Sequence, residues 1–251
     1  MSDYGRGFPR SAPAGAADMA VDAGLRGFML GVYNKVGLGL LLSGVLAYLT
    51  ANYPPVMNLL YQVQDGRLIG FTTLGMIVRF APLIMLVVSM FAMRNPSPRA
   101  AGILYWAFVS AIGAGLGVWF LVYNIPAIAT TFLVTATAFG GLSLYGYATK
   151  KDLTGFGSFL IVGLFGIIIA MVANVFLHSA MLSFVVNIIG VLIFAGLIAY
   201  DTQRLKMTYY QLGGNEASMA VATNYGALSL YLDFINLFQF LLAIFGGGSR
   251  R

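Results

Sequence analysis

Seven apolar runs recur along the chain, and most of the charged residues lie outside them, in the connections and at the two ends of the chain. The runs cover approximately residues 29–52, 70–93, 101–123, 126–148, 156–177, 180–201 and 226–247. Each is close to the ~20 residues that an α-helix needs to cross the hydrocarbon core of a bilayer. Only two connections are longer, one at 54–66 and a more polar one at 204–224. The pattern predicts an all-α integral membrane protein with seven transmembrane helices.

The composition supports this class. Hydrophobic residues make up 59% and charged residues 9% of the chain, and the mean hydropathy is +0.86, which excludes a soluble domain with a polar shell. The net charge is +6, but the basic residues lie at the ends of the apolar runs, where they fit anionic lipid head groups. We therefore expect the lipid bilayer as a partner and no nucleic acid. Cysteine is absent from the sequence, which excludes disulfides and thiolate chemistry.

The ends of the chain differ from its middle. Gly, Ala, Pro and Ser predominate in the first 25 residues, a composition typical of a disordered tail. We expect no signal peptide, because no compact apolar core with a small-residue cleavage site follows a basic start. The sequence thus predicts a disordered cytoplasmic tail at 1–25, a single membrane domain at 26–248 and a short basic tail at 249–251.

The basic residues of the loops predict the orientation. If the spans alternate, most of the loop cations share one side: Arg6, Arg10, Arg26, Arg94, Arg99, Lys150, Lys151, Arg204 and Lys206. Only Arg67, Arg250 and Arg251 fall on the other side. The positive-inside rule then places the N-terminus in the cytoplasm. For the two C-terminal arginines, either a short tail tolerates exposure outside or the seventh run enters and returns; we favour the crossing.

Two acidic residues lie within or at the end of apolar runs. Asp233 lies inside the seventh run, and Asp201 ends the sixth. A charged side chain at the centre of a membrane helix costs about 2.5–3.5 kcal/mol or more, so such a residue indicates a functional site. The sixth run travels inward and the seventh starts from the same side. If the sixth helix continues about a turn past Asp201 toward Lys206, the two carboxylates face each other near the cytoplasmic mouth.

A purely structural role stays open for each acid: Asp201 caps or decorates a wetted helix end, and Asp233 bonds a hydroxyl such as that of Tyr231 or Ser229. If the acids meet, they cannot both ionise cheaply in a low dielectric, so they share a proton and titrate as a pair. This places a switch near neutral pH. Deprotonation would add repulsion, separate the sixth and seventh helices and expose oxygen ligands suited to Ca²⁺.

Three other charged or titratable side chains indicate a functional site less strongly. Arg79 lies inside the second run, where it either snorkels outward or lines an outer vestibule that repels cations. Lys35 lies near the cytoplasmic start of the first run and fits an interfacial anchor. His178, the single histidine, lies at the outer end of the fifth run and fits a solvated turn.

Enzyme classes fit the chain poorly. An intramembrane zinc hydrolase needs several histidines and acids, and a serine hydrolase needs a base beside its nucleophile. An intramembrane aspartyl protease does use two acids on adjacent helices. The glycine that usually neighbours such acids is missing, because Tyr200 precedes Asp201 and Leu232 precedes Asp233. We expect no enzymatic activity and no cofactor.

Three segments resemble the Bax inhibitor-1 family, also called the lifeguard or transmembrane Bax inhibitor motif family. Ala227–Phe238 resembles the signature of its final helix, Tyr200–Lys206 the end of its sixth helix, and Leu142–Leu153 its fourth-to-fifth connection. The similarity runs from about residue 26 to 248. The chain looks most like the bacterial, YccA-like branch, which implies the inner (cell) membrane as its location.

The resemblance implies a bundle of six helices around a central C-terminal seventh. It also implies that Asp201 and Asp233 form a pH-sensing pair that gates a calcium leak, with Ca²⁺ as the transported ion and transient ligand. Arg94 matches an arginine that contacts the sixth-helix acid in the family. Some relatives carry an acid part-way along the second helix, where this chain has Pro82 and Leu83.

The resemblance also implies a function of a different class. Bacterial relatives modulate a membrane-anchored ATP-dependent protease, so the alternative is a membrane interaction protein with such a partner. Deleting residues 1–25 would then abolish modulation, whereas neutralising Asp201 and Asp233 would abolish ion flux. Ion selectivity and oligomeric state do not follow from the sequence.

Overall fold

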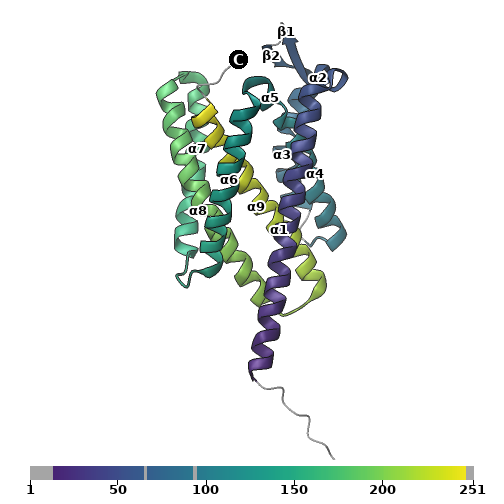
Figure 1. Ribbon diagram of the computed structural model, residues 1–251, viewed down its shortest axis with the longest axis vertical. Helices are drawn as coiled ribbons and strands as arrows, with labels where there is room; N and C mark the ends of the chain where they lie inside the picture. Colours follow the sequence, from purple (N-terminus) through teal and green to yellow (C-terminus); the bar gives the residue numbers. More distant parts are fainter. Residues whose placement is uncertain (1–13, 65–66, 93–94, 247–251) are drawn as a thin grey trace, which may run out of the picture.

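Long helices run side by side, and a small antiparallel hairpin lies beside α2 at one end of the bundle (Figure 1). The computed structural model describes residues 14–64, 67–92 and 95–246. In chain order, the elements are α1 (Ala14–Asn52), α2 (Pro54–Leu60), β1 (Tyr61–Gln64), β2 (Arg67–Phe71), α3 (Thr73–Ala92), α4 (Pro98–Leu116), α5 (Val118–Val122), α6 (Ile125–Ala148), α7 (Thr154–Leu177), α8 (Ala180–Leu212) and α9 (Glu216–Phe245).

We call the end that carries β1 and β2 the hairpin end. The opposite end carries the α6–α7 and α8–α9 connections, with Lys150, Lys151 and Arg204, and we call it the basic end (Figure 1).

Within the described ranges, six helical segments are long and apolar enough to cross a membrane: Ala23–Asn52, Pro98–Val122, Ile125–Ala148, Thr154–Leu177, Ala180–Leu212 and Glu216–Phe245. The predicted class, an all-α membrane protein, is confirmed. The second predicted run forms α3, which is apolar over the shorter stretch Thr73–Ser89 and contains Pro82. Large apolar side chains on the outer faces of α3 and α7, such as Phe91, Phe159 and Phe176, are exposed, as expected of surfaces that face lipid.

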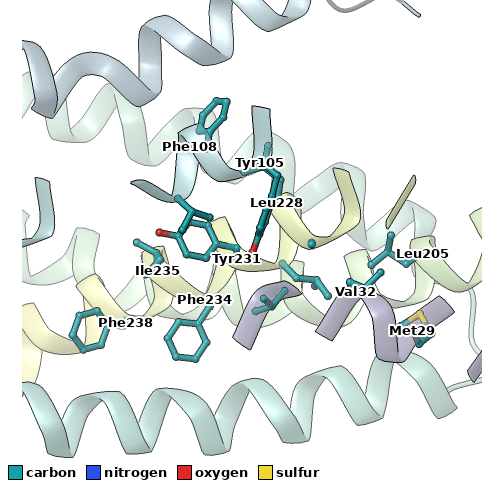
Figure 2. Close-up of a cluster of buried hydrophobic side chains, with 14 of the residues drawn as sticks. Met29, Val32, Tyr105, Phe108, Leu205, Leu228, Tyr231, Phe234, Ile235 and Phe238 are labelled. Carbon is teal, nitrogen blue, oxygen red and sulfur yellow. The ribbon is translucent and has the colours of Figure 1, made fainter. Parts of the chain in front are cut away.

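Helix α9 is the central element. It packs against α8, α1, α4 and α6, while α3 packs mainly on α4 and α7 mainly on α8. Its side chains form much of the buried core, and Figure 2 shows Tyr231, Phe234 and Phe238 of α9 among the buried residues of its neighbours.

Three boundaries differ from the sequence prediction. Helix α1 already begins at Ala14, so residues 14–25 are helical where the sequence predicts a disordered tail, while residues 1–13 lie outside the described chain. The polar connection predicted at 204–224 is mostly helix. Helix α8 continues past its apolar part to Leu212, and Gly213 follows in the left-handed conformation at φ +56°. A glycine adopts this conformation without the steric penalty of a side chain, which ends the helix there.

Close contact between α6 and α8 positions the end of α8 that carries Asp201. A Cβ atom on Gly146 would lie 2.2 Å from the backbone oxygen of Ala199. Only glycine permits this approach, because small residues let membrane helices pack backbone against backbone. The contact fixes α8 two residues before Asp201.

Candidate functional site: a buried carboxyl pair

Asp201 lies on the face of α8 that is turned into the bundle. Its side chain is 8% exposed, and its neighbours on the same face, Ile198, Thr202 and Leu205, are also buried. Helix α8 continues beyond Asp201 to Leu212, farther than the single extra turn considered from the sequence. Asp201 is therefore no cap of a helix end.

Asp233 lies in the middle of α9 and is 6% exposed. Its sequence neighbours Tyr231, Phe234 and Ile235 are part of the apolar core around the helix. An isolated carboxylate in such surroundings is strongly disfavoured unless it is paired or neutral.

The structure brings the two acids together. Their carboxyl groups are close enough to hydrogen-bond to each other, and the Ser229 hydroxyl of α9 donates a further hydrogen bond to Asp201 Oδ2. Asp233 Oδ2 is buried and has no donor among the described residues. Two ionised carboxylates offer only acceptors, so a hydrogen bond between them requires a proton on one of them. The arrangement therefore suits a pair that holds one proton.

The two hydroxyls that the sequence suggested as hydrogen-bond partners of Asp233 bond other groups. Ser229 donates to Asp201, and the Tyr231 hydroxyl lies 2.6 Å from Ser43 Oγ on α1. The Ser43 hydroxyl in turn donates to the backbone oxygen of Val109 at 3.1 Å. This hydroxyl chain joins α9 to α1 and α4, and it leaves Asp233 with Asp201 as its polar partner.

Cations lie on the basic-end side of the pair. Arg204, less than one turn after Asp201 on α8, is close enough to attract the Asp201 charge. Lys206 is bound away from the pair, because its Nζ donates to the Tyr147 backbone oxygen at 3.1 Å. Arg94, which the family resemblance assigns as counter-charge, lies outside the described residues.

The α6–α7 connection is held against α8 by one side chain. Gln203 accepts a hydrogen bond from the Leu153 amide at 2.8 Å and donates one to the Lys151 backbone oxygen at 2.7 Å. Nearby, the Thr202 hydroxyl donates to the Ile198 backbone oxygen at 2.8 Å. The Gln203 contacts anchor the basic end of α8 to the α6–α7 connection.

The site is not a preformed metal cage. Within the described part of the chain, no three His, Cys, Asp or Glu side chains are grouped in a way that suits a metal ion. Ca²⁺ takes about 6–8 oxygen ligands in its protein sites. Asp201, Asp233 and Ser229 could supply only part of such a shell.

Arg79 lies at a different place, in a cavity between α3, α4 and α9. The cavity has a volume of ≈ 610 Å³, and its lining includes Phe71 of β2 and Trp119 of α5. The Arg79 guanidinium lies over the Phe71 ring, 4.8 Å from its centroid. Pro82 and Leu83, which stand where some relatives carry an acid, also line this cavity. The remaining two residues have no part in either site: Lys35 lies over Tyr105 and Trp106, and His178 is the exposed C-cap of α7.

For two residues of the site, the sequence did not predict the role that they have in the structure. Ser229 precedes Asp233 by one helical turn, and Arg204 follows Asp201 by three residues. The spacing itself was visible, because residues three or four apart share a helix face. The sequence does not give the rotation of α9 in the bundle, however, and this rotation decides which of its faces meets α8.

Comparisons with known proteins match nearly the whole chain. A family model described as inhibitor of apoptosis-promoting Bax1 matches residues 25–250. A protein of Caulobacter vibrioides is 65% identical over 247 residues, which cover 98% of this chain and 99% of the relative. The inner membrane protein YbhL of Escherichia coli K12 is 41% identical over 225 residues, 89% of this chain and 93% of YbhL. A protein of Deinococcus radiodurans is 37% identical over 228 residues, 90% of this chain and 92% of the relative.

Proposed function

Because the chain belongs to the Bax inhibitor-1 family, as its sequence predicts, we propose that it is a pH-sensitive leak channel for calcium and related cations. The gate is the pair formed by Asp201 and Asp233. The observation that carries the proposal is that these two buried carboxyl groups lie within hydrogen-bonding distance of each other.

A shared proton gives this pair its pH sensitivity. Two carboxylates in a low dielectric repel each other too strongly to ionise together, so the pair loses its protons in two separate steps. With one proton bound, a hydrogen bond joins α8 to α9. When that proton leaves, two negative charges face each other inside the bundle.

The expected opening follows from where the acids lie. Asp233 belongs to the central helix and Asp201 to the helix against which it packs. Repulsion between them acts to separate α8 from α9 at the level of the pair. Leak is therefore low at acid pH, where the pair is protonated, and rises as the pH increases through the loss of the shared proton.

Calcium and protons compete for the same oxygen atoms in this mechanism. The ionised pair presents hard oxygen ligands, which Ca²⁺ prefers, and passing water completes its shell. A transient site of this kind is compatible with a leak, because conduction requires that an ion bind weakly enough to leave. Arg204, and Arg94 as the family resemblance implies, stabilise the ionised form of Asp201 by charge pairing.

The topology completes the proposal. With α3 as a seventh crossing, the loop cations gather at the basic end, which the positive-inside rule places in the cytoplasm together with the N-terminus. The E. coli relative YbhL is named as an inner membrane protein, and we assign this chain to the inner membrane of a bacterial cell.

Calcium flux in liposomes tests the gate. Purified protein is reconstituted with a trapped calcium reporter, and flux is followed from about pH 5 to pH 8, a range that brackets a switch near neutral pH. We expect wild-type flux to rise roughly tenfold across this range, as for the loss of one proton. Asp201→Asn and Asp233→Asn keep flux low at every pH, because an amide cannot lose a proton and still donates to the remaining carboxylate.

Asp152→Asn is the matched control. Asp152 is exposed in the α6–α7 connection, and its Oδ1 accepts a hydrogen bond from the Thr154 amide at 2.9 Å. Hydrogen bonds from Thr154 hold the pKa of this carboxyl below its usual range, so it stays ionised throughout the titration. Wild-type flux that ignores pH, or flux in Asp233→Asn that equals wild type, contradicts the gate and favours the alternative of a membrane interaction protein.

A further inference from the structure

The Arg79 cavity combines features of a binding site that the carboxyl gate does not use. It lies between α3 on one side and α4 and α9 on the other, and its volume of ≈ 610 Å³ is within the usual range for ligand pockets. Phe108 of α4 and Ile235 of α9, both labelled in Figure 2, form part of its wall. Neither Asp201 nor Asp233 is among the described residues that line it.

The wall is apolar apart from one cation and two amides. Leu83, Leu86 and Ile112 are typical of its lining, Asn236 and Gln239 of α9 supply the amide groups, and Arg79 supplies the charge. None of the described residues that line the cavity is acidic. The cavity therefore carries an uncompensated positive charge beside a surface suited to hydrocarbon.

Among the described residues, Arg79 contacts an aromatic ring and has no acidic partner. Its guanidinium carbon lies over the Phe71 ring, 4.8 Å from the ring centroid, which is a cation–π contact. A guanidinium has five N–H donors, more than one ring contact can occupy, so donors remain available to oxygen atoms. A guanidinium binds phosphate and carboxylate oxygens in a bidentate manner.

The depth of Arg79 identifies the kind of anion. Arg79 follows Thr73, the first residue of α3, by six positions, or about 9 Å of helix. A long arginine side chain extends toward the interface from such a depth, at the level where lipid head groups meet acyl chains. A ligand that pairs with Arg79 at this level and also fills the apolar part of the cavity needs an acidic head group and a hydrocarbon tail.

We propose that the Arg79 cavity binds an acidic phospholipid from the leaflet at the hairpin end. Arg79 pairs with the head-group phosphate, Gln239 lies on the opposite wall, and one acyl chain occupies the space between α3 and α4. The lipid fills the gap between α3 and the central helix, so it also stabilises the position of α3. This proposal is independent of ion flux.

Native mass spectrometry with two lipids tests the site. Delipidated protein in a mild detergent is titrated with phosphatidylglycerol, which is acidic, or phosphatidylcholine, which is zwitterionic. We expect one phosphatidylglycerol to bind at least about tenfold more tightly than phosphatidylcholine, the difference that one charge-assisted contact provides. Arg79→Gln abolishes this preference, and Arg79→Lys keeps part of it because the charge remains.

A second variant fills the cavity without touching the charge. Gly115 of α4 lines the cavity, and a Cβ atom there would meet nothing within 4 Å. Gly115→Leu therefore occupies lipid space, and we expect it to reduce binding of both lipids. Gly166→Leu on α7 is its matched control, because Gly166 is exposed and also has nothing within 4 Å of a Cβ. Lys151→Gln at the basic end controls for net charge. Both controls should bind like wild type.

Several outcomes overturn the proposal. Equal binding of the two lipids by wild type, or an unchanged preference in Arg79→Gln, removes the role of the cation. Inorganic phosphate that binds alone with the same dependence on Arg79 assigns the site to a soluble anion. A dimer that forms in wild type and is lost in Gly115→Leu assigns the cavity to a second copy of the chain. A thermal transition measured for every variant separates loss of binding from loss of fold.

Discussion

At the level of single residues, the hydrogen bond from Ser229 to Asp201 bears directly on the proposed gate. Asp233 lies in an apolar core and has Asp201 as its polar partner, whereas Asp201 also accepts the Ser229 hydroxyl. A donated hydrogen bond favours the ionised form of a carboxyl group. In the proposed pair, the ionised form of Asp201 is therefore stabilised by a hydroxyl donor, whereas Asp233 Oδ2 has no donor among the described residues.

Ser229→Ala should move the pH dependence of the leak. Without its hydroxyl donor, the ionised pair is less stable, so a higher pH is needed to remove the shared proton. A hydrogen bond to a charged group contributes about 1.5–3 kcal/mol, so the midpoint of the flux titration should rise by about one pH unit or more. The liposome assay measures this shift. Ser158→Ala is a suitable control, since its hydroxyl donates to the Thr154 backbone oxygen on an exposed face. A midpoint that stays at the wild-type pH, or falls, contradicts the assignment.

The two acids could be found from sequence, but their partners could not. A carboxyl group inside an apolar run is conspicuous because of its energetic cost, and loop charges place Asp201 and Asp233 at one depth. Hydroxyl donors are common in membrane helices and carry no such signal. Ser229 therefore resembled a partner of nearby Asp233, and only the packing of α8 against α9 assigns it to Asp201.

At the level of elements, hydropathy identified each long helix and misjudged the length of several. Helices α8 and α9 both extend toward the basic end beyond their apolar parts, and only a short turn after Leu212 separates them. The hydropathy signal ends where the helix leaves hydrocarbon, whereas backbone hydrogen bonds continue into the polar region. The segment at 54–66 was likewise predicted as a connection, but its described part, residues 54–64, forms α2 and β1.

Gly146→Ala should destabilise the contact between α6 and α8. The added Cβ would collide with the Ala199 backbone oxygen, which cannot move without shifting α8. Overpacking of this kind costs about 1–3 kcal/mol, which corresponds to a fall in Tm on the order of 5 °C for a chain of this size. Gly140→Ala on the same helix is the control, because a Cβ there meets nothing within 4 Å. Thermal unfolding in detergent compares them, and equal Tm values for the two variants would show that the approach of α6 to α8 is not tight.

For the whole molecule, α3 decides whether the chain crosses the membrane six or seven times. Its apolar stretch is shorter than the six long spans, and Pro82 interrupts its backbone hydrogen bonding. Its bundle position beside α4 and its lipid-facing apolar side chains favour a crossing. In the structure α9 packs against α8, α1, α4 and α6, in line with the central seventh helix that the family resemblance implies.

Cysteine labelling measures the crossing, because the natural chain has no cysteine to interfere. Gln62, Arg99 and Lys151 are exposed positions that tolerate a reporter. With seven crossings, Gln62→Cys in the hairpin reacts with an impermeant maleimide in intact spheroplasts, whereas Arg99→Cys and Lys151→Cys react only after the membrane is opened. Labelling of Gln62→Cys and Arg99→Cys from the same side would mean that α3 does not cross.

The proton that we propose is shared between Asp201 and Asp233 is tested most directly by infrared difference spectroscopy of the protein in lipid, titrated upward from acid pH. We predict a carbonyl band of a protonated carboxyl group that persists at about pH 6, where an isolated aspartate is fully ionised. The band disappears as the leak opens, it is absent in both Asp201→Asn and Asp233→Asn, and it is retained in Asp152→Asn. A spectrum without this band at pH 6, or one in which the band survives both substitutions, contradicts the shared proton and with it the gate.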